Sequence, residues 1–303
     1  MSVPVLGKRA AYLVIDNAKR RNALSLTVLR SLRDQLHNFN TGPDGMLRIL
    51  PPFDPGLIDE LEAASVKGTK SKYSWLLDAE EWREVRKDLP SVLVLRTQGP
   101  VFCSGHDLGE LRKLSYEEVK ETFALCAEVM TLIRRSPAPV VAVIQGLATA
   151  AGCQLAFTTD FPITTSTTQF QLPGQSLGLP CTSPSTAVTR RLGAPFTYRM
   201  LATAEPIQAR HLPAGALDIV DDPASLEDRV TSVVNRLSEE TASQIQAFGK
   251  WAFWTQKSFQ SPADGYEEAV AWTGRVMALH SKSTHAKEGM KSFFEKRKPQ
   301  WHL

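Results

Sequence analysis

Two short, uniformly apolar runs, each followed at once by a glycine-containing turn, constrain the fold of this 303-residue chain more than any other feature of its sequence. The first run is VLVL at residues 92–95, and the second is PAPVVAVI at residues 137–144. Neither run alternates with polar residues, so each is predicted to be a strand that is buried on both faces. Such strands are typical of parallel sheets covered by helices.

Helical patterns precede and separate these two runs. A further strand is predicted at residues 11–16, and apolar residues then recur at helical spacing in two segments. These apolar residues are Leu29, Leu32, Leu36 and Phe39 in the first segment and Val119, Phe123, Cys126, Met130 and Ile133 in the second. Because parallel strands require crossover connections, the order strand, helix, strand, helix, strand predicts a layered α/β fold with right-handed helical crossovers.

The C-terminal third and one internal stretch depart from this alternation. Helices are predicted at residues 226–237, 242–254, 266–279 and 286–296, which carry most of the tryptophans. We therefore expect a core at residues 1–225 and a C-terminal helical region at residues 226–303.

Residues 41–83 are rich in proline and glycine and exceed an ordinary connection, so they are predicted to be an insertion. Residues 54–64 and 71–85 could each form a short amphipathic helix within it. The insertion is then either a surface excursion or a lid over the functional site.

Composition and cysteine spacing bound the class of protein. The 35 Lys and Arg residues against 32 Asp and Glu leave a net charge of +3, which is too balanced to indicate nucleic acid as a partner. Four cysteines without CxxC spacing argue against a zinc site and against a disulfide scaffold. No apolar run approaches the ~18 residues of a membrane-spanning helix. The N-terminus lacks the apolar core of a signal peptide, and no transit peptide is evident before the first strand.

The turns after the two buried strands are the segments most suited to chemistry. Gly105 precedes His106 in the first turn, and the small residues ATAAG at 148–152 form the second. A helix is predicted to begin in each turn, so free backbone N–H groups point toward whatever lies in front of them. Two such turns at neighbouring strand ends could direct one N–H each at a shared oxygen, which is the arrangement of an oxyanion hole.

Five segments, taken in order, resemble the signature segments of the enoyl-CoA hydratase/isomerase superfamily, also called the crotonase superfamily. They are RRNALSL at 20–26, VFCSGHDLGEL at 101–111, APVVAVIQGLATAAGCQLAFTTD at 138–160, LPGQSLGL at 172–179 and FFEKRKPQW at 293–301. The resemblance covers nearly the whole chain apart from the insertion. It implies a ClpP/crotonase-like spiral of ββα units with a C-terminal helical trimerisation region.

The same resemblance implies a ligand, an assembly and a compartment. The substrate would be a fatty acyl-CoA thioester, with no separately bound cofactor and no metal. The protein would form a homotrimer or a hexamer. Its location would be mitochondrial, with the cytoplasm and the peroxisome as alternatives.

The family's site residues carry over position by position. The resemblance assigns the two oxyanion N–H groups to His106 and Ala151. It assigns contacts with coenzyme A to Arg21, Ala23, His106, Asp107, Leu108 and Gly109. A basic C-terminal segment would bind phosphates through Lys296, or through Arg297 or Lys298. From its place before an apparent helix, Asp107 is also predicted to be a helix N-cap.

The family's two catalytic glutamates are absent from this sequence. Hydration of an enoyl thioester needs one group to activate water and another to handle the α-proton. The two glutamate positions hold Gln154 and Gly174, neither of which can transfer a proton at neutral pH. The GHD sequence of the first turn also resembles acyl-CoA decarboxylases of the superfamily, whose tyrosine would align with Cys181. Cys181 is then expected either to line the acyl pocket or to be a buried core residue.

Three functions stay open on this sequence. The first is an enoyl-CoA hydratase-like lyase that works through an oxyanion hole, with the His106 imidazole as a candidate for proton transfer. The second is a decarboxylase of a malonyl-type acyl-CoA. The third is a non-catalytic acyl-CoA-binding protein that kept the hole and lost the carboxylates.

Overall fold

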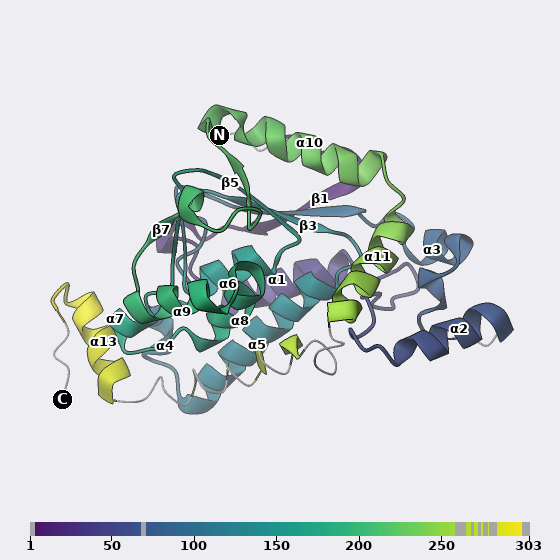
Figure 1. Ribbon diagram of the computed structural model, residues 1–303. Helices are drawn as coiled ribbons and strands as arrows, with labels where there is room; N and C mark the ends of the chain where they lie inside the picture. Colours follow the sequence, from purple (N-terminus) through teal and green to yellow (C-terminus); the bar gives the residue numbers. More distant parts are fainter. Residues whose placement is uncertain are drawn as a thin grey trace.

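The computed structural model of the chain describes residues 4–67, 71–257, 265–267, 270, 271, 274, 278 and 284–298. A five-stranded, all-parallel sheet forms the centre of the fold, with strand order β1-β2-β3-β5-β8 (Figure 1). The strands are β1 (Ala10–Ile15), β2 (Val92–Thr97), β3 (Val140–Ile144), β5 (Phe161–Thr165) and β8 (Asp218–Val220). Both apolar runs are strands, and residues 92–95 have no exposed surface, so the prediction of strands buried on both faces is confirmed.

A second, three-stranded sheet lies at the carboxyl ends of these strands. It consists of β4 (Leu147–Thr149), β6 (Gln169–Gln171) and β7 (Ile207–Gln208). β4 directly follows β3 and leads into α6 (Ala151–Thr158), and β6 follows β5 and leads into α7 (Gly174–Leu177). Two strands followed by a helix therefore repeat along the chain, as expected for a crotonase-like spiral.

Helices cover both faces of the larger sheet. Alternate side chains of β1, β2 and β3 pack on α1 (Leu26–Asn38), α5 (Tyr116–Arg135), α6 and α8 (Thr182–Leu192) in the main core. The other side chains, among them Val94 and Val143, pack against α10 (Leu226–Glu239) on the opposite face. Figure 1 shows α10 alone above the sheet and the other helices below it. The predicted apolar stripe of α1 faces the main core, as do Cys126, Met130 and Ile133 of α5, whereas Val119 and Phe123 of α5 belong to a separate apolar cluster with Leu111 and Leu179.

The described part of the chain contains further helices and single 3-10 turns. The helices are α2 (Leu57–Lys67), α3 (Ala79–Val85), α4 (Leu108–Leu111), α9 (Ala194–Thr203), α11 (Ser243–Gln256) and α13 (Thr284–Phe294). Single 3-10 turns occur at η1 (Ala18–Arg20), η2 (Ser74–Leu76), η3 (Ala209–His211) and η4 (Pro223–Ser225). The helices predicted near 226–237, 242–254 and 286–296 are thus confirmed as α10, α11 and α13. The one predicted at 266–279 falls largely outside the described residues.

The segment predicted to be an insertion, residues 41–83, packs at the end of the molecule opposite to α4, α7 and α13 (Figure 1). Its residues Leu61, Trp75 and Trp82 form a separate apolar cluster with Trp251 of α11. Residues 71–85 do not form one helix, because Asp78 accepts hydrogen bonds from the N–H groups of Glu80 and Glu81 and so caps a new helix, α3. In the described part of the chain, no helix is both long enough and apolar enough to cross a membrane.

Candidate active site

The two turns singled out in the sequence are joined by backbone hydrogen bonds. The Cys103 N–H donates to the Leu147 carbonyl at 3.2 Å, and the Thr149 N–H donates to the Cys103 carbonyl at 3.0 Å. Gly105 has φ +85°, and a Cβ on it would lie 2.9 Å from the Ala150 Cβ and 3.3 Å from the Ala151 nitrogen. Only glycine fits this contact without strain. The turn that carries His106 therefore lies against the N-terminus of α6.

The backbone N–H groups of His106 and Ala151 have no hydrogen-bond acceptor among the described residues. Ala151 is the first residue of α6, where helix geometry leaves the N–H free. Beside His106, the Gly105 carbonyl accepts from the Leu24 N–H at 2.8 Å and the Asp107 N–H donates to the Leu24 carbonyl. This parallel pairing with Leu24 uses the backbone groups on either side of His106, and the N–H of His106 has no acceptor in it. Both residues line one pocket of about 320 Å³.

Ala150 holds the turn before α6 in a strained conformation. Its φ of 52° and ψ of −121° lie in a region that non-glycine residues rarely adopt. Its N–H donates to the Gln171 carbonyl at 2.9 Å, which fixes the turn against β6. Strain at such a position costs about 1–3 kcal/mol and is commonly found at functional sites. Here it sets the direction of the Ala151 N–H.

The pocket has apolar walls and few polar groups. Leu108, Leu111 and Phe123 line one part of it, and Leu177 and Leu179 another. The described lining residues include no Asp or Glu. An apolar cavity with two free N–H donors suits a neutral acyl chain that carries one polarisable carbonyl oxygen.

The predicted site residues divide into two groups in the structure. Arg21, His106, Leu108, Ala151, Gly174 and Cys181 all line the pocket, whereas Ala23, Asp107, Gly109, Gln154 and Lys296 do not. Several other lining residues were not predicted from the sequence, namely Ser104, Thr149, Gln171, Ser176 and Phe293. Four of them lie within the segments that carried the family resemblance, and Gln171 lies directly before one, so the motif boundaries were the available signal. Which side chain of a motif faces the pocket depends on packing.

The His106 imidazole is an apolar contact rather than a charged group. Its ring packs edge-on against Phe123 with 4.6 Å between ring centroids, and Nδ1 lies 3.4 Å from the Leu24 carbonyl oxygen. Burial lowers the pKa of His106 to about 4, and the Leu24 carbonyl only partly opposes this effect. The imidazole is therefore neutral at physiological pH.

The two positions of the missing glutamates differ in their surroundings. The Gln154 side chain is fully buried and turned to Ser183 of α8, with 3.1 Å from its amide nitrogen to the hydroxyl oxygen. At Gly174, a Cβ would lie 2.1 Å from the Leu179 carbonyl oxygen and 2.6 Å from the Cys181 nitrogen. No side chain can leave the backbone at Gly174 unless the 179–181 segment moves. The site thus lacks both acids, and one position has no space for an acid.

Cys181 fits both sequence expectations, because it is buried and also lines the pocket. Burial raises the pKa of its thiol to about 12, although a backbone hydrogen bond with Gly174 opposes the shift. The group is therefore a neutral thiol at physiological pH. It contributes an apolar wall beside Gly174 rather than a nucleophile.

Asp107 acts as a helix cap, as predicted. Its carboxylate accepts from the Glu110 N–H at 3.1 Å at the start of α4, and it also accepts from Arg20 at 2.7 and 2.8 Å. The Arg20 contact was not foreseen from the sequence. Both interactions fix Asp107 and thereby stabilise the turn that carries His106.

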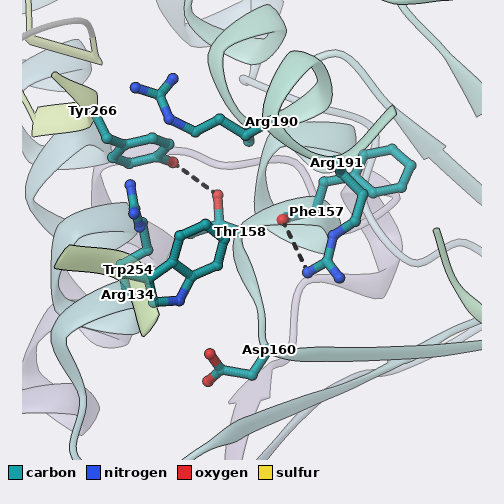
Figure 2. Close-up of a pocket in the computed structure, with 9 residues that line it drawn as sticks. Arg134, Phe157, Thr158, Asp160, Arg190, Arg191, Trp254 and Tyr266 are labelled. Atoms are coloured by element: carbon teal, nitrogen blue, oxygen red, sulfur yellow. Dashed lines mark hydrogen bonds between the residues drawn. The ribbon is translucent and has the colours of Figure 1, made fainter. Parts of the chain in front are cut away.

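The C-terminal end of α6 is anchored by an aromatic and cationic cluster, drawn in Figure 2. The Tyr266 hydroxyl lies 3.0 Å from the Thr158 hydroxyl, which donates to the Gln154 carbonyl at 2.6 Å. The guanidinium groups of Arg134 and Arg190 lie 4.2 and 4.6 Å from the centre of the Tyr266 ring, on either side of it in Figure 2. α6 is therefore fixed at both ends, with its first N–H at the pocket.

The basic C-terminal segment lies next to the pocket through α13. Phe293 of α13 lines the pocket, and Lys296 follows the helix with an exposed side chain. Arg297 is already paired, since it donates to the Glu288 carboxylate at 2.6 and 3.0 Å and to Glu295 at 2.6 Å. Lys296 and Lys298 are thus the cations of this segment that remain available to a phosphate.

The chain is similar to known proteins of one family. The family model described as enoyl-CoA hydratase/isomerase matches residues 79–303. The mitochondrial enoyl-CoA hydratase domain-containing protein 3 of Rattus norvegicus is 31% identical over 291 residues, covering 95% of this chain and 80% of the rat protein.

Two further matches concern a solved structure and a named enzyme. The crystal structure of human enoyl-CoA hydratase domain-containing protein 3 matches with a TM-score of 0.65 and 29% identity, covering 98% of each chain. The methylmalonyl-CoA decarboxylase of Escherichia coli (strain K12) is 26% identical over 206 residues, covering 66% of this chain and 75% of that protein.

Proposed function

Because this chain belongs to the enoyl-CoA hydratase/isomerase family, we propose that its pocket binds an acyl-CoA thioester and holds the thioester oxygen with the N–H groups of His106 and Ala151. The observation that supports this proposal is the pair of N–H groups without acceptors, both on the wall of one apolar pocket. Two donors at this oxygen stabilise the enolate that forms when charge builds up there, each by roughly 3 kcal/mol.

Hydration of an enoyl-CoA is the reaction that we propose first. The oxyanion hole stabilises the negative charge that develops in this reaction. Few side chains of the pocket can carry out the proton transfers that the reaction also needs. Arg21, His106 and Cys181 are the titratable side chains among the described lining residues. The His106 imidazole is neutral and could accept a proton, but its pKa of about 4 makes it a weak base. Each missing glutamate would contribute roughly 10²- to 10⁴-fold. Hydration is therefore expected to be slow compared with a family member that carries both glutamates.

Decarboxylation of a malonyl-type acyl-CoA is the second candidate, and the absence of acidic lining residues favours it. In this reaction the bond between Cα and the carboxylate carbon breaks, carbon dioxide leaves, and the electron pair moves into the thioester enolate. The enolate then takes a proton at Cα from the solvent. The oxyanion hole stabilises the enolate, and no carboxylate base is needed. An acidic wall would instead repel the substrate carboxylate.

Contacts with coenzyme A, assembly and location follow as parts of the same proposal. Arg21 lines the pocket, and Lys296 lies just beyond Phe293 of α13, so these two cations are proposed to bind the phosphates of coenzyme A. A homotrimer or hexamer and a mitochondrial location are proposed from the family resemblance and from the named location of the rat relative.

A panel of acyl-CoA substrates tests the proposal. The purified protein is incubated with crotonyl-CoA, a longer enoyl-CoA and methylmalonyl-CoA, and loss of the conjugated enoyl thioester and release of carbon dioxide are followed. Binding of acetyl-CoA is measured by calorimetry in parallel. Binding with turnover of an enoyl-CoA supports hydration, and carbon dioxide release supports decarboxylation. Binding without turnover of any substrate identifies a non-catalytic acyl-CoA-binding protein, and absence of binding contradicts the whole proposal.

A further inference from the structure

A second pocket lies at the opposite ends of the central strands. Its volume is about 400 Å³, and it is lined by residues that precede β1 and β2, by the end of α3 and by the start of α11. Lys8 and Arg9 come just before β1, and Ser91 just before β2. The thioester pocket lies beyond the other ends of these strands, at Ser104 and Ala150. The two pockets therefore share no lining residue.

The charges around this second pocket are mostly positive. Four cations, Lys8, Arg9, Arg83 and Arg86, line it against one carboxylate, that of Asp88. The Lys8, Arg9, Arg83 and Asp88 side chains are exposed at the mouth. An excess of charge of one sign in a concave site concentrates ligands of the opposite sign.

Arg86 is the buried member of this group, with 7% of its surface exposed. Its guanidinium donates to the Pro90 carbonyl at 3.0 Å and to the Asn40 side-chain oxygen at 3.4 Å, and it lies 5.6 Å from the centre of the Trp82 ring, so these partners are all neutral. Burial lowers the pKa of Arg86 to about 10. No Asp or Glu of the described chain pairs with it. A buried cation is usually paired, so a charge without a carboxylate partner beside a cavity indicates an anionic ligand.

The start of α11 adds a second source of positive potential. This 14-residue helix begins at Ser243, which lines the pocket, and the residue before it provides no side-chain cap. The Ser243 hydroxyl accepts from the Trp82 Nε1–H at 3.1 Å and lies 3.4 Å from Arg9 Nη2. The helix terminus is thus tied to the wall of the pocket, with its dipole directed into it.

We infer that this pocket, formed by Lys8, Arg9, Arg83, Arg86 and the start of α11, is a binding site for a small phosphate-bearing anion, separate from the thioester pocket. Phosphate oxygens accept from guanidinium and ammonium groups and from a helix terminus at once. A volume of about 400 Å³ suits a ligand of metabolite size. Two of its lining residues, Trp82 and Arg83, lie at the end of the segment predicted to be an insertion, which gives the end of that segment a ligand-binding role away from the thioester chemistry.

Titration of the full-length protein with inorganic pyrophosphate tests the inference. We expect saturable binding of one pyrophosphate per chain, measured by calorimetry at low salt, and a matching rise in melting temperature. The variants Lys8→Gln/Arg9→Gln and Arg83→Gln should each weaken binding by roughly tenfold or more, because each removes charged donors. These cations are exposed, so the fold should survive their replacement.

Two matched variants locate the site. Lys87→Gln removes the same charge from an exposed neighbour of Arg86 that does not line the pocket, and it should leave the affinity within about twofold. Arg21→Gln removes a cation of the thioester pocket and should also leave pyrophosphate binding unchanged. The inference is overturned if pyrophosphate does not bind, if the Lys8→Gln/Arg9→Gln variant binds it like the unmodified protein, or if Arg21→Gln weakens it most.

Discussion

The two positions that the family resemblance aligns with its catalytic glutamates, Gln154 and Gly174, have physically different surroundings. Gln154 keeps the size of a glutamate but lies fully buried beside Ser183, while Gly174 has the backbone of residues 179 and 181 where a side chain would begin. The first position could regain a carboxylate only as a buried charge. The second could not regain one without rearrangement of the loop.

The Gln154→Glu variant is expected to be less stable by roughly 2–3 kcal/mol at neutral pH, because an ionised carboxylate would be buried with only the Ser183 hydroxyl as a donor. Urea denaturation measures the loss. Burial raises the pKa of such a carboxyl above its unfolded value, so the loss should shrink as the pH falls and the group becomes protonated. Gln175→Glu, an exposed change of the same charge, serves as the control and should alter stability by less than about 0.5 kcal/mol. Equal effects of the two variants would contradict the burial argument.

His106 makes the stability of the protein depend on pH in a defined direction. Its pKa is lowered to about 4 in the folded state, so between about pH 6.5 and pH 4 the unfolded chain binds a proton that the folded chain does not. Stability is fully present above this window and falls as the pH drops through it, by up to about 3 kcal/mol. Denaturation of the protein and of a His106→Gln variant across this range should show a steeper loss for the unmodified protein. Parallel curves would show that His106 is not desolvated.

At the scale of elements, α6 connects the candidate chemistry to the rest of the core. Its first N–H faces the pocket, and its last turn is held by Tyr266 (Figure 2). The helix starts after Ala150, whose positive φ is the strained position of the described turn. The geometry of the hole therefore depends on a backbone conformation, which no side-chain motif displays.

The Ala150→Gly variant is expected to raise the free energy of unfolding by roughly 1 kcal/mol, because glycine adopts this conformation without the steric cost of a Cβ. Chemical denaturation measures the change. Ala202→Gly, at an exposed position inside α9, should have the opposite effect and lower the free energy of unfolding by about 0.5–1 kcal/mol. A loss of stability in both variants would mean that the turn before α6 is not strained.

The elements of the central sheet and its helices could be read from the sequence because their burial pattern is local. Residues 92–95 and 140–144 are apolar without interruption, and the stripes of α1 and α5 have clear helical spacing. The helices of the segment predicted to be an insertion were harder to predict, because the Asp78 cap divides a continuous helical pattern into two elements. Its apolar side chains are visible in the sequence, but the sequence does not show that they pack on Trp251, which is far away along the chain. Such distant pairings leave no periodic signal.

The site was predictable to the level of its backbone turns and no further. The pattern of buried strands and glycines predicted that the two turns lie together, and the family resemblance assigned the N–H groups to His106 and Ala151. It could not show that Gln154 turns to Ser183 or that the 179–181 segment fills the space at Gly174, because both facts depend on how α7 and α8 pack.

At the scale of the whole molecule, the two proposed binding sites lie in separate pockets. Residues of α4, α7 and α13 line the thioester pocket, and residues of α3, α11 and the segments before β1 and β2 line the basic pocket. Figure 1 shows these two groups of helices at opposite ends of the molecule. The segment predicted to be an insertion packs on α11. None of its described residues lines the thioester pocket, so the described part of this segment does not form a lid over that pocket.

The proposed assembly is also a property of the whole molecule. A homotrimer or hexamer is expected from the family resemblance, and the exposed side chains of Ile245 and Phe253 on α11 give the surface apolar area for such contacts. Light scattering coupled to gel filtration should give a mass of three or six chains at micromolar concentration. The mass of one chain would contradict the proposed assembly.

The central claim, that the thioester oxygen is held by the N–H groups of His106 and Ala151, is tested most directly by difference infrared spectroscopy. Acetyl-CoA labelled with carbon-13 at its thioester carbonyl is bound to the protein and compared with the unlabelled ligand, so that the ligand band is isolated. Two N–H donors polarise the carbonyl and weaken its double bond. We predict that the band moves to lower frequency than in free acetyl-CoA. Saturable binding with an unshifted band would contradict the claim.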